Sequence, residues 1–294
     1  MKKSINAQTR LIGLFGDPME HSLSPLFMNR SLELLSFNYL YLAFRINSEH
    51  LENALSAVKL LGVRSINLTI PHKHTAIPLI GNIQKEAEII GAVNCIVNDS
   101  GKLKGYNTDW EAFIQPLKEI NINFNAIKVL LIGCGGAARS VLYVLAKEGV
   151  KEVYLSNRTP KKADSFIQWA RNKLNYNQIH YTTSPSLLPP HLLSSVELIV
   201  NTTPVRMFPY IEESSLPCDV SFKKGQVVYD LIYNPGETNL LASARRDGAL
   251  CINGFDMLIN KGLNSLGLRF SEKQNEITAI KRKVIEYTKK HAVL

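Results

Sequence analysis

The chain has 294 residues, of which 45% are hydrophobic and 20% are charged, as expected for a folded globular protein with room for two domains. Part of its formal net charge of +9 lies in the C-terminal run 281–291, which is typical of a solvated helix face. Aromatic and basic residues do not alternate in a stacking pattern, which argues against nucleic acid as a partner, whereas a modest positive field suits an anionic cofactor and substrate.

The cysteines and the apolar segments indicate a compartment. Cys95, Cys134, Cys218 and Cys251 lack metal-ligand spacing and are expected to be buried thiols in a reducing environment. No apolar run approaches the roughly 18 residues of a membrane helix, and no signal peptide is recognised. We therefore expect a cytoplasmic protein without a membrane partner.

Strands and helices alternate over the first part of the chain, which predicts one α/β unit. Ser24 is expected to cap the first helix, with Pro25 at its first position, and Gly62 to end the second helix. The expected strands are 11–15, 39–45, 65–70, 94–98 and 102–106, and the expected helices are 24–35, 51–61 and 78–90.

Residues 128–159 hold the most informative pattern of the chain. A buried strand at 128–132 runs into small residues at the G-x-G-x-x-A spacing, and a helix and a second strand at 152–156 follow. The small residues are Gly133, Gly135 and Ala138. They permit a tight turn and close approach of the backbone to a pyrophosphate at the helix N-terminus, so this context predicts a dinucleotide-binding domain.

The rest of this domain is read from weaker patterns. A helix at 110–119 leads into it, and the fingerprint helix covers 137–147. Pro185, Pro189 and Pro190 indicate a surface loop. The later strands are expected at 180–182, 198–201, 227–231 and 249–252, and the final helices at 254–266 and 272–291.

The loop after the second strand of this pattern indicates which nucleotide binds. An NAD site usually has an acidic residue there for the ribose 2′-hydroxyl, but this chain has Asn157, Arg158 and Thr159, followed by Lys162. Arg158 and Lys162 would attract a 2′-phosphate, so the loop favours NADP over NAD. The alternative is a basic, solvated loop that happens to follow a strand.

Polar clusters stand at the ends of several predicted strands, where ligands of α/β sheets bind. Ser22 and Ser24 offer two hydroxyls to a carboxylate beside a helix N-terminus, although Ser24 has the alternative of only capping that helix. Asn67, Asn94 and Thr108 suit hydrogen bonds to the hydroxyls of a bound ring, but buried amides are also common structural ties.

Lys73 follows a strand and a proline, and Asp109 follows another strand. A lysine beside a ketone can stabilise the alkoxide that forms when hydride arrives and can supply its proton, and an aspartate can orient that lysine. The alternative is that both are ordinary exposed charges. His72 and His74 lie close together, but no further ligand has fitting spacing, so no metal site is expected.

The ordered motifs resemble one family over nearly the whole chain, from Gly16 to about Gly262: the shikimate/quinate dehydrogenases. The resemblance rests on GDP at 16–18, HSLSP at 21–25 with Asn29, NLTIPHK at 67–73, GAVN at 91–94, GYNTD at 105–109, GCGGA at 133–137, NRT at 157–159, NTTP at 201–204, YDLIYNP at 229–235, NG at 253–254 and ML at 257–258.

This resemblance implies an α/β substrate domain with a mixed sheet at 1–109, an NADP-binding Rossmann domain at 110–253, and C-terminal helices at 254–294 that return to the substrate domain. It implies reversible NADPH-dependent reduction of 3-dehydroshikimate to shikimate in aromatic amino acid biosynthesis, by a monomer or homodimer. The alternatives are a dehydrogenase of quinate or a related ring acid, and a non-catalytic NADP-binding paralogue.

The resemblance also implies residue roles. Ser22 and Ser24 would hold the substrate carboxylate, and Lys73 and Asp109 would form the catalytic pair. The substrate pocket would further include Asn67, Thr69, Asn94, Thr108 and Tyr233. The cofactor would lie near Gly133, Gly135, Gly136, Ala137, Asn157, Arg158, Thr159, Lys162, Thr203, Leu231 and Gly254.

The chain departs from the family pattern at a few positions. It has Met28, Ala112, Arg206 and Asp256 where the family usually has other residues. Lys261 replaces a glutamine that the family uses toward substrate hydroxyls. A charged lysine donates hydrogen bonds but cannot accept them, and it adds a positive charge beside Lys73, so substrate identity is the property most affected.

Overall fold

A computed structural model describes residues 5–20, 22–184, 194–204 and 221–292. The chain divides into two compact units, one formed by residues 1–112 with 258–293 and the other by residues 113–257. The chain passes from one unit to the other within helix α5 (Asp109–Glu119) and again within helix α10 (Gly254–Arg269). Within the described ranges, no helix is both long and apolar enough to cross a membrane.

The first unit contains a mixed six-stranded sheet in the order β2-β1-β3-β5-β6-β4. Strand β1 pairs in parallel with β2 and β3, whereas β5 pairs antiparallel with β3 and β6, and β4 lies parallel to β6 at the edge. The strands are β1 (Arg10–Gly16), β2 (Tyr39–Arg45), β3 (Ser65–Leu68), β4 (Asn82–Ile83), β5 (Cys95–Asp99) and β6 (Lys102–Tyr106).

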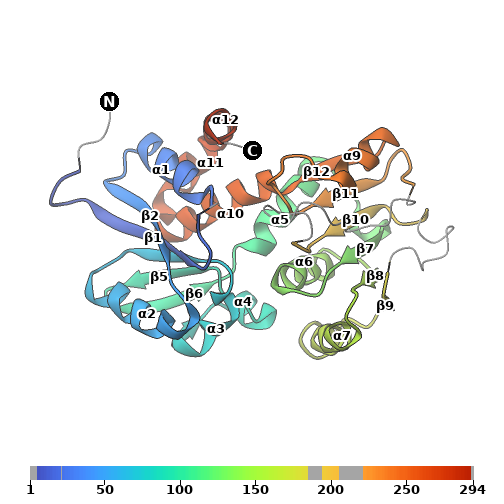
Figure 1. Cartoon of the computed structure of the whole chain (residues 1–294), viewed down its shortest axis with the longest axis horizontal. Helices are drawn as coiled ribbons and strands as arrows, with labels where there is room; N and C mark the ends of the chain where they lie inside the picture. The colour runs from blue at the N-terminus through green and yellow to red at the C-terminus, as the bar shows by residue number, and fades with distance from the viewer. Residues whose placement is uncertain (1–4, 21, 185–193, 205–220, 293–294) are drawn as a thin grey trace. The chain divides into compact units, whose positions relative to one another are not determined.

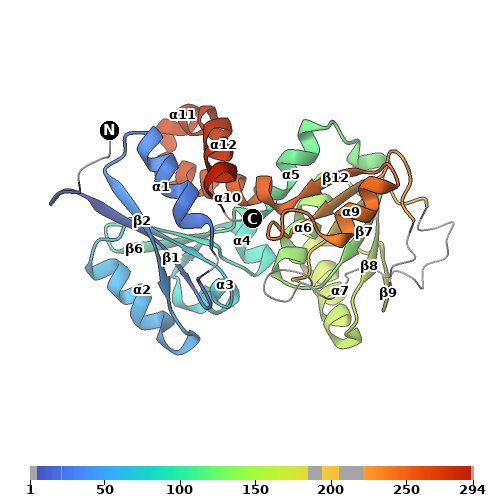
Figure 2. The same ribbon diagram turned by 45° about the horizontal axis from the view of Figure 1, so that its top comes forward.

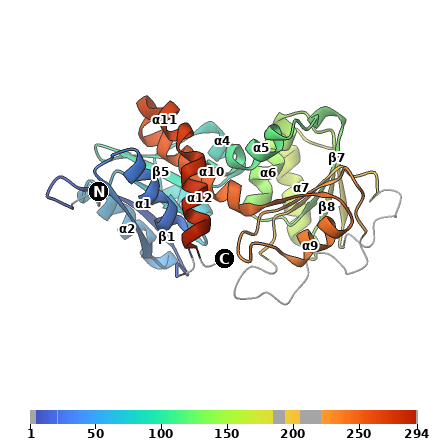
Figure 3. The ribbon, with the colours of Figure 1, turned by 90° about the horizontal axis from the view of Figure 1, so that it is seen from above.

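Helices cover both faces of this sheet (Figure 1). On one face, α2 (Leu51–Leu60) packs its apolar side against Phe15, Ile66 and Leu68, in a core that also includes the segment around α3 (His72–Thr75). On the other face, α1 (Ser24–Leu34) packs on β2 beside α12 (Lys281–His291), with Figure 3 showing the two helices side by side. The C-terminal helices therefore belong to the same unit as the N-terminal sheet.

The first unit also contains shorter helical segments. The α-helices are α4 (Lys85–Ile90) and α11 (Gln274–Ala279), and the 3₁₀ segments are η1 (Ser48–His50), η2 (Ile77–Leu79) and η5 (Ser271–Lys273).

The second unit contains an all-parallel sheet in the order β12-β11-β10-β7-β8-β9. Its central strands are almost wholly apolar because both of their faces are covered. The strands are β7 (Lys128–Ile132), β8 (Glu152–Ser156), β9 (Ile179–Thr182), β10 (Leu198–Asn201), β11 (Val227–Asp230) and β12 (Leu250–Asn253).

The order of this sheet reverses between β7 and β10, and this gives the fold a topological switch point. Helices α6 (Gly136–Lys147) and α7 (Pro160–Leu174) lie on one face, and α9 (Asn239–Arg246) lies on the other, as Figures 2 and 3 show. The segment η3 (Phe124–Ala126) precedes β7. Ligands of such sheets bind at the carboxyl ends of the strands flanking the reversal, and this is the edge at which the glycine turn lies.

Several expected elements have different boundaries in the structure. The helix expected at 78–90 is a 3₁₀ turn, the short strand β4 and a helix that begins only at Lys85. The helix expected at 272–291 is broken into α11 and α12 around Ile280, and the expected strand 65–70 ends at Leu68. Tertiary packing overrides the local apolar periodicity in these segments. The proline loop expected from Pro185 lies outside the described residues.

Helices α3, α7 and α9 are not predicted by the sequence patterns. Pro160 stands at the start of α7, a position that favours a helix because its missing N–H has no partner there anyway. Thr238 caps α9 by accepting a hydrogen bond from Leu241 N, although its Oγ1 is 3.4 Å from that nitrogen. Both are recognisable start signals, but each stands in a polar stretch with little apolar periodicity.

The buried Gly254 provides a test of this fold. A Cβ at this position would collide with the backbone carbonyl of Leu231, so we expect Gly254→Ala to lower the free energy of unfolding by roughly 2–4 kcal/mol. Gly236→Ala is the matched control because a Cβ there meets nothing within 4 Å. Chemical denaturation of both variants checks the prediction, and equal stabilities would contradict it.

Candidate functional site

Lys73 and Asp109 form a largely buried ion pair in the first unit. Lys73 Nζ lies 2.6 Å from Asp109 Oδ2, and the side chains are 19% and 4% exposed. Lys73 belongs to the short helix α3, and its carbonyl accepts a hydrogen bond from Val93 N. Asp109 is the first residue of α5, and the Asn107 side chain accepts a hydrogen bond from its backbone N–H. Local turns at two strand ends therefore bring together residues that lie 36 positions apart.

A closed set of hydrogen bonds orients the carboxylate of Asp109. Asn94 Nδ2 donates to Asp109 Oδ1 at 2.8 Å and to Thr108 Oγ1 at 3.1 Å. Asn94 Oδ1 accepts from the backbone N–H of Thr108 at 2.8 Å, and this contact fixes which end of the amide faces the aspartate. The second oxygen of Asp109 is thereby left for Lys73. Asn94 and Thr108, both expected in the substrate pocket, thus contact or flank the Lys–Asp pair.

Asp109 stays ionised despite its burial. Burial acts to raise its pKa, but the charges of Lys73 and Lys261 and the hydrogen bonds from Lys73 and Asn94 outweigh it, so the pKa lies below its ordinary value. The carboxylate therefore remains a hydrogen-bond acceptor for the Lys73 ammonium at neutral pH.

Lys261 brings a second positive charge close to this pair. It lies on α10, its backbone carbonyl accepts hydrogen bonds from Ser265 and Thr108, and its side chain is partly buried. Burial lowers the pKa of Lys261 to about 8, with the charge of Lys73 acting in the same direction and Asp109 opposing them. Near neutral pH a fraction of Lys261 is therefore neutral and can accept a hydrogen bond as well as donate one.

Ser22 and Ser24 lie where α1 begins. The expected cap is wrong: the N-cap is Leu23, no side chain caps the helix, and Ser24 is its first residue. Ser22 Oγ instead accepts a 3.3 Å hydrogen bond from Ser24 N, and the side chain of Ser24 interacts with the buried Tyr41. The hydroxyl of Ser24 is thus not committed to the helix, in keeping with the alternative role of binding an anion.

Asn67 and Thr69 differ in what they offer a ligand. The amide of Asn67 uses all four of its hydrogen-bonding positions within the protein, so a substrate hydroxyl can reach it only by replacing one partner. Thr69 is partly exposed, and the hydroxyl has no partner among the described residues. Tyr233, expected in the same pocket, belongs to the second unit and is partly buried there.

The expected cofactor residues lie along the carboxyl edge of the parallel sheet. Gly133 follows β7 with a φ of +105°, and a Cβ there would come within 2.6 Å of Thr202 Oγ1 and 3.0 Å of the Thr203 side chain. Gly135 is the N-cap of α6, and a Cβ there would meet nothing within 4 Å. No side chain caps α6, so its first N–H groups are free of a side-chain partner, and the glycine turn fits a pyrophosphate.

Side-chain hydrogen bonds hold the neighbouring loops of this edge. Asn201 Oδ1 accepts from the N–H and the hydroxyl of Thr203, and Asn201 Nδ2 donates to Asp230 at 2.9 Å. Leu231 N donates to the carbonyl of Asn201 at 3.0 Å, and Gly254 packs on the Leu231 carbonyl. Thr203, Leu231 and Gly254 therefore form one continuous rim with Gly133.

The basic loop after β8 lies on the same edge. Asn157 Nδ2 donates to the carbonyl of Thr159, which fixes the loop, whereas Arg158 and Lys162 are exposed. The charge of Lys162 acts on the thiol of Cys134 in the glycine turn, whose pKa burial nevertheless raises to about 12. Two exposed cations in this loop, of which Lys162 acts on the glycine turn, suit a nucleotide that carries an extra phosphate. Gly136 and Ala137 form the first turn of α6.

The sequence patterns do not predict the buried residues that hydrogen-bond the site residues and fix their orientation. Tyr41, Ser265 and Arg269 link Asn67 to its surroundings in the first unit, and Asp230 accepts bonds from Asn201, Thr238 and Ile232 N in the second. Burial raises the pKa of Asp230, against these hydrogen bonds. A polar residue at the end of an apolar strand was the available signal for Asp230. Arg269 gave none, because a basic residue in the last turn of a helix is common.

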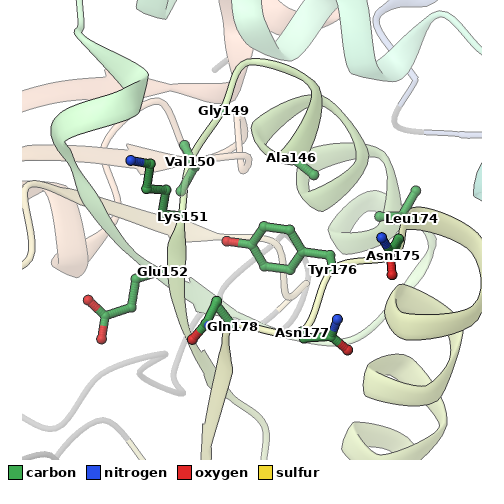
Figure 4. A pocket seen from close by; sticks show the side chains of 10 residues that line it. All are labelled: Ala146, Gly149, Val150, Lys151, Glu152, Leu174, Asn175, Tyr176, Asn177 and Gln178. Carbon is green, nitrogen blue, oxygen red and sulfur yellow. The ribbon is translucent and has the colours of Figure 1, made fainter.

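A separate cleft lies at the opposite edge of the parallel sheet (Figure 4). It is lined by residues from the ends of α6 and α7 and the start of β8, among them Gly149, Glu152, Tyr176 and Gln178. Because it lies at the amino ends of the strands, it is distinct from the glycine turn. In the described ranges, no group of three or more possible metal ligands is found, and His72 and His74 instead contact backbone carbonyls.

The chemistry of the two units defines the class of protein. A Lys–Asp pair can hold and protonate an oxygen, but it contains no electrons with which to reduce a carbonyl, so a hydride donor must be bound as well. The glycine turn and basic loop of the parallel sheet suit such a donor. A Lys–Asp pair in one α/β unit and a glycine turn with a basic loop in the other are the features that a nicotinamide-dependent dehydrogenase requires.

Comparisons with known proteins give the family. A model described as the shikimate dehydrogenase substrate binding domain matches residues 14–96, and one described as shikimate / quinate 5-dehydrogenase matches 116–204. The curated shikimate dehydrogenase (NADP(+)) of Caldanaerobacter subterraneus is 40% identical over 87% of this chain and 90% of that protein. The chain belongs to the shikimate dehydrogenase family, which confirms the resemblance seen in its motifs.

Solved structures agree with this assignment. Shikimate dehydrogenase from Aquifex aeolicus is 38% identical with a TM-score of 0.81, over 90% of this chain and 94% of that one. The Thermus thermophilus enzyme, solved in complex with NADP(H) and shikimate, is 28% identical with a TM-score of 0.79, over 94% of this chain and 99% of that one. The predicted fold class, a mixed-sheet α/β unit with a Rossmann-type unit, is confirmed.

The lowered pKa of Lys261 predicts a pH-dependent gain of stability on its removal. The cost of charging this side chain in the folded state is fully present below about pH 8 and disappears as pH rises toward the unfolded value of 10.5. We expect Lys261→Met to raise the free energy of unfolding by roughly 2 kcal/mol at pH 7, allowing for its partial exposure, and by much less at high pH.

Urea denaturation across this pH range checks the prediction. Lys59→Met on α2, at an exposed position of the same unit, is the matched control and should show no such trend. A stability difference between Lys261→Met and the parent chain that is constant with pH would contradict the assigned cause.

Proposed function

We propose that this protein catalyses the reversible, NADPH-dependent reduction of 3-dehydroshikimate to shikimate. The observation that carries the proposal is the buried Lys73–Asp109 pair, at 2.6 Å, in a chain of the shikimate dehydrogenase family. The relatives are named NADP(+) enzymes, and related structures contain shikimate and NADP(H). The reaction belongs to the supply of aromatic amino acids.

The roles of the side chains follow from this geometry. NADP(H), when bound, supplies or accepts the hydride. Lys73 binds the ketone oxygen, stabilises the negative charge that develops on it and provides its proton, while Asp109 keeps the ammonium group oriented. Asn94 and Thr108 hold Asp109 and line the ring site, together with Thr69 and Lys261.

Ser22 and Ser24 bind the substrate carboxylate at the start of α1 in this proposal. Support comes from the absence of a side-chain cap on that helix, so the hydroxyl of Ser24 is not committed to the helix backbone. Asn67 holds the residues of the ring site through its hydrogen bonds. Tyr233 is a further substrate-binding residue in this proposal.

The two units have different functions in this proposal. We assign substrate binding to residues 1–109 with the helices of 254–294, and NADP binding to 110–253. The glycine turn of Gly133, Gly135, Gly136 and Ala137 binds the pyrophosphate, and Asn157, Arg158, Thr159 and Lys162 bind the 2′-phosphate. Thr203, Leu231 and Gly254 form the rim beside the nicotinamide.

A second candidate substrate is quinate or a related ring acid. Lys261 favours it, because this lysine, which is charged in most molecules and neutral in a fraction of them, stands where the family usually has a glutamine. It therefore offers the ring hydroxyls a different hydrogen-bonding pattern from that of a neutral amide. The test of both is the oxidation of NADPH and NADH with 3-dehydroshikimate and with 3-dehydroquinate, followed by absorbance. Turnover of the first with NADPH supports the proposal, whereas cofactor binding without any turnover would show a non-catalytic paralogue.

We also propose a cytoplasmic location and a monomer or homodimer. In the described part of the chain, Cys95, Cys134 and Cys251 are free thiols, which is typical of a reducing compartment, although only Cys95 is fully buried as expected. Cell fractionation tests the location, and light scattering of the purified chain tests the oligomeric state.

Loss of the Lys73 ammonium should affect turnover more than cofactor binding. We expect Lys73→Ala to lower kcat by about 10²–10⁴-fold while the KM for NADPH changes less than about twofold, because the group acts on the substrate oxygen. Exposed Lys102→Ala, on β6 of the same unit, is the control. A loss confined to NADPH affinity would contradict the role.

Arg158 should select the nucleotide. We expect Arg158→Gln to raise the KM for NADPH by about 10- to 100-fold and to leave the KM for NADH nearly unchanged, because only NADPH carries the 2′-phosphate. Lys161→Gln, in the same basic stretch, controls for the general charge of the loop. Steady-state kinetics with both nucleotides gives the result, and an equal effect on both would argue for a solvated loop.

A further inference from the structure

Arg269 is a buried cation that hydrogen-bonds only neutral groups among the described residues. It ends α10 in the first unit and is 3% exposed. Nη2 donates to Asn67 Oδ1 at 2.9 Å and lies 3.7 Å from Cys95 Sγ. Nε and Nη1 are buried and have no hydrogen-bond partner in the described part of the chain. A guanidinium cannot lose its charge in a protein, so the positive charge persists inside the unit.

An unpaired buried charge is costly, and removing the side chain from water requires a compensating interaction. The charged residue that the hydrogen bonds place beside it is another cation: Arg64 donates to the backbone carbonyl of Arg269 at 3.4 Å. The packing around Arg269 therefore does not offset its positive charge, whereas an anion bound close to it would do so.

Arg269 also determines the orientation of the Asn67 amide. Because arginine only donates, the Asn67 atom that it contacts has to be the oxygen. The amide nitrogen then faces the opposite way and donates to Ser265 Oγ at 2.9 Å and to the carbonyl of Asn94 at 3.2 Å. Ser265 in turn donates to the carbonyl of Lys261 at 2.8 Å. Arg269 is thus connected to the residues around the Lys–Asp pair.

The same amide oxygen connects Arg269 to the start of α1. The hydroxyl of Tyr41 donates to Asn67 Oδ1 at 3.1 Å, and Tyr41 also interacts with the side chain of Ser24. Burial raises the pKa of Tyr41, but the charge of Arg269 acts in the opposite direction, which places the guanidinium within electrostatic reach of that hydroxyl. Hydrogen bonds therefore connect the guanidinium through Asn67 to Tyr41, the residue that interacts with Ser24.

We propose that Arg269 is a positioning residue of the substrate site, which orients Asn67 and places its charge behind Ser24 so that a carboxylate is bound there in preference to a neutral group. The inference rests on the proposed function, because it takes the substrate to be a ring acid held at Ser22 and Ser24. The carboxylate is the anion that offsets the charge of the buried guanidinium.

The test compares two ligands that differ in charge, shikimate and its methyl ester, in the full-length protein with NADP present. We expect Arg269→Met to weaken shikimate binding about tenfold and ester binding less than about twofold, as measured by calorimetry. Arg64→Met is the matched control, since Arg64 touches the Arg269 backbone but not Asn67, and it should change both affinities equally little. Arg269→Lys should retain the preference for shikimate and Arg269→Gln should lose it.

Tyr41→Phe provides a variant that leaves Arg269 in place. It removes the hydroxyl between Asn67 and Ser24, and it should weaken shikimate binding more than ester binding even if Arg269→Met does not fold. Equal losses for both ligands in the Arg269 and Tyr41 variants would overturn the role proposed for Arg269. Parent protein that neither binds nor oxidises shikimate would instead overturn the proposed function, and the inference with it.

Discussion

The ionised state of Asp109 is the constraint on which the rest of the first unit depends. A buried carboxylate is unfavourable by itself, and it is stabilised here by Lys73, Lys261 and the amide of Asn94. Each of these groups is held by backbone contacts: Lys73 by Val93, Asn94 by Thr108, and Lys261 by Ser265. The polar interior of the unit is therefore organised around one negative charge and the cations that balance it.

The second unit follows a different rule. Its sheet is apolar and covered on both faces, so polar groups gather at the carboxyl edge, where the strand order reverses. Asn201 and Asp230 connect the loops after β10 and β11 through side-chain hydrogen bonds, and the close packing of Gly254 on Leu231 joins the loop after β12. These few short contacts, rather than a large packed surface, fix the loops at the carboxyl edge of the sheet. The loops can therefore be ordered while their polar groups remain accessible to a ligand.

The sequence predicted the parallel sheet better than its surroundings. Strands such as β7, β8 and β10 are continuous apolar runs bounded by turn residues, and their limits agree with the structure. The sequence predicts neither α3 nor β4, because both are too short to have a period. It predicts one helix across α11 and α12, because the break at Ile280 has no glycine or proline. Lys73 and Asp109 can be predicted as site residues because they follow predicted strands. Tyr41 and Arg269 cannot, because hydrogen bonds between residues far apart in the chain leave no local sequence pattern.

The fully used hydrogen-bonding capacity of Asn67 has an evolutionary consequence. Its side chain donates to Ser265 Oγ on α10 and to the carbonyl of Asn94, and it accepts from the hydroxyl of Tyr41 on β2 and from Arg269 Nη2 on α10. Aspartate would lack the donors, leucine would lack donors and acceptors alike, and glutamine would reach one methylene too far. No other side chain can make these four hydrogen bonds. We therefore expect asparagine to be kept at this position even in a related protein that has evolved to bind a different ligand.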